Sequence, residues 1–116
     1  MKYMLLIYAE EAGWHALTPE QQKHGVAAYG AYTEALNAAG IRLASDRLRN
    51  TDTATSVRIV GGETKVLDGP YAESKEQLAG FYMIDVPDLD TALSWAARCP
   101  GAAYGTIEVR PIWDVY

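Results

Sequence analysis

The stretch "QLAGFYMIDV", Gln77 to Val86, carries apolar side chains at both odd and even positions. Successive side chains of a strand point to opposite faces of a sheet, so this stretch predicts a strand that is covered on both sides. "KYMLLIYA", Lys2 to Ala9, shows the same pattern, because its odd and its even positions are both apolar. The two segments are therefore expected at the centre of one sheet.

The first helix is predicted by "TPEQQ", which combines three signals for a helix start. Thr18 can serve as the N-cap, Pro19 suits the first helical position, and Gln21 completes a capping box. Apolar residues then recur at helical spacing from Tyr29 onward, and Gly40 predicts the end of the helix. The segment before this helix, residues 10–17, is expected to form a loop.

A β-hairpin is predicted in the middle of the chain. The strand-like segments "TSVRIV" and "ETKVLD" are separated by Gly61 and Gly62, a pair typical of a two-residue turn. Another segment, "IRLASDRL", Ile41 to Leu48, alternates as a strand ahead of the hairpin. The hairpin is therefore expected to be an insertion between two strands of the central sheet.

A second helix and a last strand complete the chain. Asp88 follows Pro87 and is expected to cap the helix, which ends before Pro100. The last strand is predicted over Gly105 to Trp113. The buried stripe of the second helix is predicted to consist of Leu89, Ala92, Leu93 and Ala96.

This order of elements predicts an α+β fold in a single domain, residues 1–116. It corresponds to a ferredoxin-like split βαβ arrangement with an inserted β-hairpin. Both helices of such a fold lie on one face of the sheet, yet the two central strands are apolar on both faces. Since the chain has no further helix to cover the second face, we expect a homodimer in which sheet faces sheet.

Composition excludes several classes of partner. The formal net charge of −5 and the lack of any Lys/Arg run argue against nucleic-acid binding. No stretch approaches the ~20 apolar residues of a membrane span, so no membrane association is expected. Cys99 is the only cysteine, which excludes an intramolecular disulfide and suits a reducing compartment. A cytoplasmic location is therefore the expectation.

Metal, cofactor and nucleophile motifs are weak in this sequence. His15 and His24 lie nine residues apart without a third histidine or cysteine at ligand spacing, so no metal site is predicted. No glycine-rich segment opens a helix, so no phosphate loop or other cofactor site is predicted. Cys99 has only Arg98 as a basic neighbour and is interpreted as a packing residue.

The segment "DGPYAESKE", residues 68–76, combines a turn with a dense group of polar side chains. Asp68, Gly69 and Pro70 each favour a turn, and a structural turn followed by a solvated segment would account for them. A turn alone does not explain why Tyr71 and several acceptors gather where a buried strand begins. The segment therefore has two interpretations, the edge of a functional pocket and a purely structural fastener.

If the segment is a pocket edge, it predicts a small-molecule site. Asp68 and Glu73 are the candidate general bases. Positive charge for a small anionic ligand is expected from arginines on otherwise apolar strands, and the helix contributes a tyrosine hydroxyl. The predicted ligand-binding residues are Tyr29, Arg58, Tyr71, Lys75 and Arg110.

The same segment, with the sequence through "QLAGFYMIDVPDLDTALSWAARCPGA", resembles the DGPF-type branch of the YCII-related family. The signature of that branch is Asp-Gly-Pro-Phe followed by Ala-Glu-Thr-Lys-Glu, and this chain has Tyr71 and Ser74 in place of the phenylalanine and threonine. "MKYMLLIY", "TATSVRIV" and "IEVRPI" are also similar to the family. The resemblance covers essentially the whole chain and implies a dimeric α+β barrel.

The resemblance brings no settled activity. Better-studied YCII-like relatives resemble lactone-isomerase-type barrels, in which a His–Asp pair is proposed for acid–base chemistry. Aligning the first helix on Gly40 places Tyr29 at the histidine, and the aspartate that precedes a proline falls at Cys99. Neither residue of the pair is retained, and His24 would lie on a different face of the helix. That mechanism is therefore not expected here.

Three hypotheses follow for the function. The first is a small-molecule-binding or enzyme-like homodimer with a cavity edged by the "DGPY" loop, with catalysis left undecided. The second is a regulatory or interaction module, because some relatives lie beside or are fused to extracytoplasmic-function sigma factors. The third is that the "DGPY" segment is purely structural.

Overall fold

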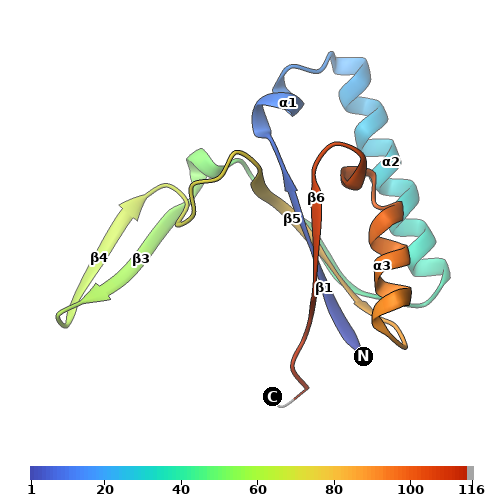
Figure 1. Ribbon diagram of the computed structural model, residues 1–116. Helices are drawn as coiled ribbons and strands as arrows, with labels where there is room; N and C mark the ends of the chain where they lie inside the picture. The colour runs from blue at the N-terminus through green and yellow to red at the C-terminus, as the bar shows by residue number, and fades with distance from the viewer. Residues whose placement is uncertain (115–116) are drawn as a thin grey trace.

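Four antiparallel strands form the main sheet of the computed structural model, which describes residues 1–114. Their order is β2–β5–β1–β6, with the two segments that are apolar on both faces at the centre (Figure 1). This order confirms the predicted ferredoxin-like α+β arrangement. The strands are β1 (Lys2–Ala9), β2 (Arg42–Arg47), β5 (Gln77–Asp85) and β6 (Thr106–Pro111).

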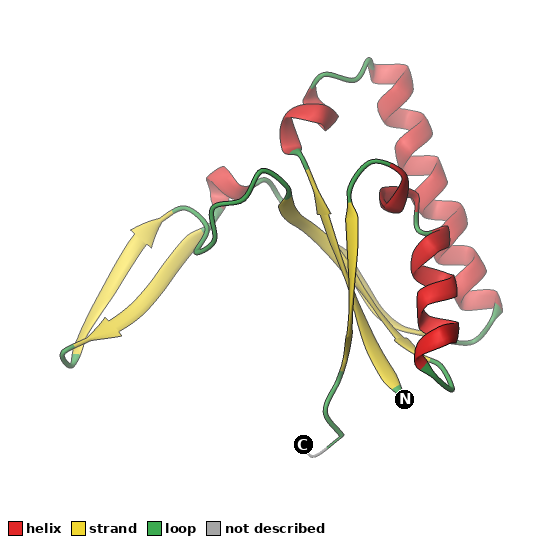
Figure 2. Ribbon diagram, viewed as in Figure 1, coloured by secondary structure: helices red, strands yellow, loops and turns green. Residues whose placement is uncertain are grey.

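Two helices, α2 (Pro19–Ala38) and α3 (Leu89–Arg98), cover one face of this sheet (Figure 2). The start of α2 has the predicted capping box. The Gln21 backbone N–H donates to the Thr18 hydroxyl at 3.2 Å, and the Thr18 N–H donates to the Gln21 side chain at 2.9 Å. Gly40 has a φ of 72°, which glycine adopts without strain, and it ends the helix as predicted.

The hydrophobic core lies between the sheet and these two helices. Aromatic rings make specific contacts in it: Tyr32 and Tyr82 pack edge to face with ring centroids 5.2 Å apart, and the Tyr32 hydroxyl donates to the Trp95 carbonyl at 2.7 Å. The buried core residues are Tyr3, Leu5, Ile7, Tyr32, Leu36, Tyr82, Ile84, Val86, Ala92, Ala96 and Cys99.

The opposite face of the sheet has no helix over it. Alternate residues of the two central strands point to this side, and the register places them opposite one another across the pair. We call this group the open sheet face, and it consists of Met4, Leu6, Tyr8, Phe81 and Met83. An apolar strip of this kind on the uncovered side of a sheet is unusual for a monomer, because such a side is normally polar.

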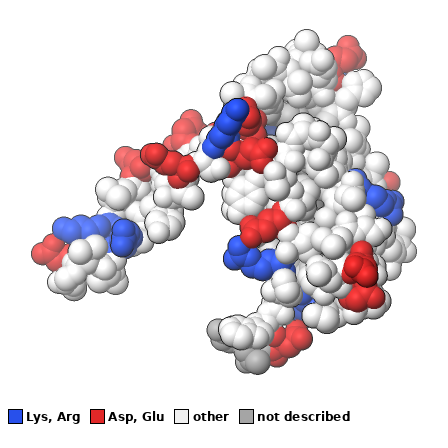
Figure 3. Space-filling view, in the orientation of Figure 1, with Lys and Arg blue, Asp and Glu red and all other residues white. Residues whose placement is uncertain are grey.

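The predicted hairpin forms a separate two-stranded sheet of β3 (Thr55–Val60) and β4 (Glu63–Asp68). Gly61 and Gly62 connect the strands with φ of 58° and 81°, as a two-residue turn requires. The hairpin projects away from α2 and α3, and a gap separates most of it from the body (Figures 1 and 3). It raises the radius of gyration to 16.1 Å, compared with about 13 Å for a compact domain of this length.

Two details of the fold differ from the sequence predictions. A short helix, α1 (Glu11–His15), replaces part of the predicted loop. In α3, Leu89 and Leu93 are exposed, so half of the predicted buried stripe was wrong. The buried positions are Ala92, Ala96 and Cys99, because α3 lies close to the sheet on its small residues and turns the leucines toward solvent.

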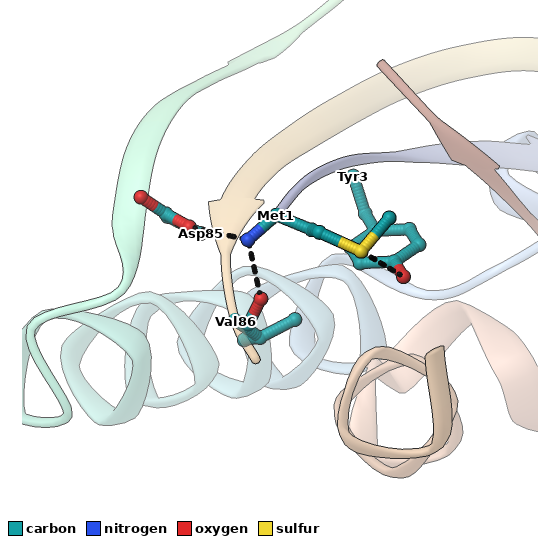
Figure 4. A network of polar contacts seen from close by, with 4 residues as sticks. All are labelled: Met1, Tyr3, Asp85 and Val86. Carbon is teal, nitrogen blue, oxygen red and sulfur yellow. Dashed lines mark hydrogen bonds and ion pairs between the residues drawn. The ribbon is translucent and has the colours of Figure 1, made fainter. Parts of the chain in front are cut away.

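The start of β1 is fastened to the end of β5 (Figure 4). The Met1 nitrogen donates to the Val86 carbonyl at 2.8 Å and to the Asp85 carboxylate at 3.2 Å. The Val86 N–H donates back to the Met1 carbonyl at 2.9 Å. These bonds continue the central strand pair by one residue, and the exposed ion pair adds little energy to them.

Candidate functional site

The Asp-Gly-Pro turn closes the root of the hairpin. The Gly69 N–H donates to the Ala54 carbonyl at 2.7 Å, and the Ser56 hydroxyl donates to the Gly69 carbonyl at 2.8 Å. Gly69 has a φ of 108°, a conformation that side-chain-bearing residues rarely adopt. This part of the signature therefore acts as a fastener between β3 and β4.

Helix α1 holds the loops on both sides of the hairpin root. The Glu11 carboxylate accepts from the Thr51 N–H at 2.6 Å and from the Thr51 hydroxyl at 3.0 Å. The Glu11 N–H donates to the Gln77 side chain at 3.2 Å, and the His15 ring hydrogen-bonds the Asn50 amide at 2.6 Å. These contacts tie the end of β1 to the segment after β2 and to the start of β5.

A hollow of about 440 Å³ lies between these loops, at the end of the open sheet face. Residues of the short helix η1 (Thr51–Thr53) and of the "DGPY" segment both line it. The lining residues are Tyr8, Leu48, Arg49, Asn50, Thr51, Thr53, Ala54, Pro70, Tyr71, Ala72, Ser74, Glu76, Gln77 and Leu78. Two aromatic rings, several apolar side chains and a few polar groups thus share one concave surface, which is the usual composition of a ligand site.

The charged groups around the hollow differ in how far they are already engaged. Glu76 accepts from the Thr106 hydroxyl at 2.6 Å. The Arg47 guanidinium lies over the Trp14 ring, 4.7 Å from its centroid. Among the described residues 1–114, Arg49 makes no ion pair. It is therefore the cation in the wall that remains available for an anionic ligand.

Of the predicted site residues, Tyr71 lines the hollow, with 83% of its surface exposed. Asp68 is exposed at the end of β4, and Glu73 is exposed in the loop outside the lining. Lys75 pairs with Glu10 at 3.6 Å on the surface. Of the four candidate site residues in the signature segment, the structure therefore brings only Tyr71 into the hollow wall.

The other predicted ligand-binding residues lie elsewhere. Arg58 belongs to the hairpin, beyond its root. Arg110 is on β6, where it pairs with Glu108. Tyr29 is on α2, across the sheet from the hollow. These three side chains do not converge with Asp68 or Tyr71, so the combined site predicted from the sequence is not assembled within one chain.

Sequence reasoning missed Arg49, Asn50 and Thr51 as candidate site residues. They follow β2 in a segment without periodicity, and only the fold brings them opposite residues 70–78. Helix α1 was missed as well, because five residues are too few for a helical pattern. The signal in the sequence for α1 was Glu11, a carboxylate just after a predicted strand. In the structure it accepts from both the backbone N–H and the hydroxyl of Thr51.

Tyr29 and Cys99, the two positions that the family resemblance assigns to a histidine and an aspartate, are in contact. The Cys99 Sγ lies 3.8 Å from the Tyr29 hydroxyl, and Gly101 packs against the same hydroxyl. Burial raises the pKa of Tyr29 and of Cys99 above their ordinary values. Both groups are therefore neutral near pH 7, and this pair is part of the packed core.

This burial predicts a loss of stability at alkaline pH. The raised pKa of Tyr29 means that the folded state keeps a proton that the unfolded chain releases above its ordinary value of 10.0. The contribution of Tyr29 to stability is therefore unchanged below about pH 10 and falls as the pH rises further, by up to about 1.4 kcal/mol per pH unit. Urea unfolding at pH 8 and pH 11 should show a smaller decline for Tyr29→Phe than for the wild type.

The burial of Tyr32 and Tyr82 raises their pKa in the same way, so the decline should be reduced in Tyr29→Phe but not abolished. Tyr71→Phe is the control, because it removes the hydroxyl of an exposed tyrosine and should keep the wild-type decline. Equal declines for the wild type and Tyr29→Phe would contradict the assignment of a neutral, buried phenol.

The fold and the hollow define a class: an α+β protein with a ferredoxin-like sheet, one uncovered apolar face and a concave site at its end. Within that class, the chain belongs to the YCII-related domain family, which matches residues 1–116. An uncharacterized protein of Rhizobium meliloti is 39% identical over 114 residues, which is 97% of this chain and 92% of that protein.

A solved structure is similar over nearly the whole fold. It is the 5-chloro-2-hydroxyhydroquinone dehydrochlorinase of Burkholderia phenoliruptrix in complex with 2,5-dihydroxybenzoquinone. The TM-score is 0.58 with 14% sequence identity, and the match covers 97% of this chain and 94% of the other. At this sequence identity, the comparison shows a shared fold and nothing about function. In the described residues 1–114, no helix is both long and apolar enough to cross a bilayer.

Proposed function

We propose that this protein is a small-molecule-binding homodimer whose ligand occupies the hollow beside the "DGPY" segment. The observation that carries this proposal is the hollow itself. Its volume of about 440 Å³ lies within the range of roughly 300–1,000 Å³ that is typical of ligand pockets. Tyr71, from the family-like signature, forms part of its wall.

The wall indicates the chemistry of the ligand. Tyr8 and Tyr71 offer ring surfaces, and Leu48 and Leu78 extend the apolar area. Arg49 adds a cation without an ion-pair partner among residues 1–114. A small organic acid with a flat ring or a short apolar body fits this combination, since its carboxylate can pair with a guanidinium. Arg49 takes the role that the sequence prediction gave to Arg58 and Arg110.

The homodimer is proposed from the open sheet face. Leu6 and Phe81 lie opposite each other at its centre, and no element of the described chain covers them. A second copy related by a two-fold axis would present the same apolar surface, so the two faces can cover each other. Tyr8 belongs both to this face and to the hollow, which places the ligand next to the proposed interface.

The similar fold supports the small-molecule part of this proposal. The dehydrochlorinase structure holds a six-membered cyclic compound, so a protein with this fold accepts a ligand of the size proposed here. The catalytic roles of Asp68 and Glu73, the cytoplasmic location and a sigma-factor partner stay predictions. Among the described residues, Glu76 is the one carboxylate in the lining and it is bonded to Thr106, so we propose binding and leave a reaction aside.

A thermal-shift screen with small aromatic and aliphatic acids tests the binding proposal. A ligand at 100 times its Kd stabilises the folded state by about 2.7 kcal/mol, which raises Tm by roughly 10 °C for a domain of this size. Tyr71→Ala and Arg49→Ala should each weaken binding of the best acid by tenfold or more. Tyr104→Ala, which truncates an exposed tyrosine outside the hollow, should bind like the wild type.

Two results would contradict the proposal. One is a screen in which no acid raises Tm at millimolar concentration. The other is an acid that binds the wild type, Tyr71→Ala and Arg49→Ala with the same affinity, since the ligand would then lie outside the hollow.

A further inference from the structure

We propose that the hairpin is an arm that clasps a second copy of the chain, with one of its two faces docked on the partner protomer. The hairpin arm consists of β3, β4 and the turn between them, residues 55–68. The inference rests on the homodimer proposed above, and it adds a second contact region to that dimer. It is carried by the composition of the two faces of the arm, by its position, and by the size of the open sheet face.

The two faces of the arm differ in chemistry. The register pairs Val57 with Val66 and Ile59 with Thr64, so these side chains share one face, which we call the apolar arm face; Thr55 and Asp68 end it at the root of the hairpin. The other face pairs Arg58 with Lys65 and carries an ion pair of 3.0 Å between Lys65 and Glu63. Its remaining members are Ser56, Val60 and Leu67. An alternation of this kind predicts that the apolar arm face is covered and that the charged face meets water.

Nothing in the described part of the chain covers the apolar arm face. Val57 is 62% exposed, Ile59 72% and Val66 60%. No residue of the arm belongs to the buried core of the body. A single two-stranded hairpin is marginally stable in water, so an arm that keeps its shape needs a surface to pack on. That surface has to come from another molecule.

The position of the arm identifies a second copy as that surface. The arm leaves the body on the side of the open sheet face, away from α2 and α3 (Figures 1 and 2). Between arm and body lies a notch that is visible in Figure 3. A protomer that covers the open sheet face therefore enters this notch and meets the arm as well. By two-fold symmetry its own arm meets the first protomer in the same way.

The size of the open sheet face supports the same conclusion. The whole uncovered side of the sheet, four strands of 6–9 residues about 4.8 Å apart, has a footprint of roughly 450 Å². Stable interfaces bury about 800 Å² per partner, so this face alone is small for a lasting dimer. The arm adds two strands of 6 residues each, about two fifths as much again. The proposed contact of arm and sheet together approaches the usual size.

Neighbouring residues on opposite faces of the arm provide a matched test. Ile59→Lys places a charge on the apolar arm face, and Val60→Lys places the same charge on the other face one residue away. Both side chains are more than half exposed, so neither substitution should disturb the fold. Sedimentation equilibrium over a concentration series should show the dimer Kd of Ile59→Lys raised tenfold or more. Val60→Lys should stay within about threefold of the wild type, with unchanged circular dichroism.

The possible results distinguish the arm proposal from the dimer proposal. If both arm variants dimerise like the wild type while a charge on the open sheet face dissociates it, the arm proposal is wrong and the dimer stands. Equal weakening by both variants would also overturn the arm proposal, because it would indicate pairing through the backbone edges of β3 and β4. A wild-type protein that is monomeric at every concentration would overturn the dimer and the arm together.

Discussion

The substitution Leu6→Lys is expected to disrupt the proposed sheet-facing dimer and leave a monomer. Leu6 lies at the centre of the open sheet face, opposite Phe81 on one side and Glu108 on the other. In the proposed dimer this face is buried, so a lysine there loses its hydration, and Glu108 opposite it is already paired with Arg110. A two-fold interface contains the substitution twice. Together these costs should raise the dimer Kd at least about 100-fold, which corresponds to about 2.7 kcal/mol.

The measurement is the molar mass by light scattering on a sizing column, from micromolar to near-millimolar protein. Leu93→Lys is the control, because Leu93 is a similarly sized residue that is 46% exposed on the outer side of α3. It should dimerise like the wild type. If Leu6→Lys keeps the wild-type mass at all concentrations, the sheet-facing dimer is wrong.

Alanine at position 105 is expected to cause the largest loss of stability among single-methyl substitutions. Gly105 precedes β6, and a Cβ atom built there would overlap the Tyr8 carbonyl oxygen and lie 3.3 Å from the Ala9 Cα. The obstacle is backbone, so it cannot rotate away, and β1 and β6 would have to separate where they meet. Overpacking usually costs about 1–3 kcal/mol, and we expect the upper end of that range or more. This corresponds to a Tm about 10 °C lower.

Gly30→Ala is the matched control. Gly30 lies within α2, and nothing lies within 4 Å of the position of an added Cβ. Alanine loses less backbone entropy than glycine on folding, so this variant should be more stable by about 0.5–1 kcal/mol. Thermal unfolding of both variants checks the pair of predictions. A Gly105→Ala protein that unfolds within 2 °C of the wild type would contradict the close approach of β1 and β6.

Most of the fold was predictable because its signals are local. The capping box at Thr18, the turn at Gly61 and the stop at Gly40 each depend on a few neighbouring residues, and the structure has all three. The sheet order was predictable from the two-sided apolar pattern of the central strands. The exposed leucines of α3 were not, since the distance between helix and sheet is set by tertiary packing rather than by helical spacing.

The candidate site was only partly predictable. The signature segment drew attention to Tyr71, which lines the hollow, yet the residues from the segment after β2 that line it as well carry no pattern of their own. Arg49 follows β2 by two residues and reaches the hollow only because η1 and the hairpin root fold over the sheet end. The sequence instead predicted Arg58 and Arg110 as the cations of the site, because they are charged residues on otherwise apolar strands. Neither residue lines the hollow.

The separation between the hairpin arm and the hydrophobic core has an evolutionary consequence. Since no arm residue is part of the core, substitutions in the arm change the partner surface without altering the stability of the rest of the domain. After a gene duplication, the arms of two paralogues can therefore diverge quickly while both domains keep folding. Related chains in one cell can in this way stay in separate homodimers, each with its own ligand, instead of exchanging subunits.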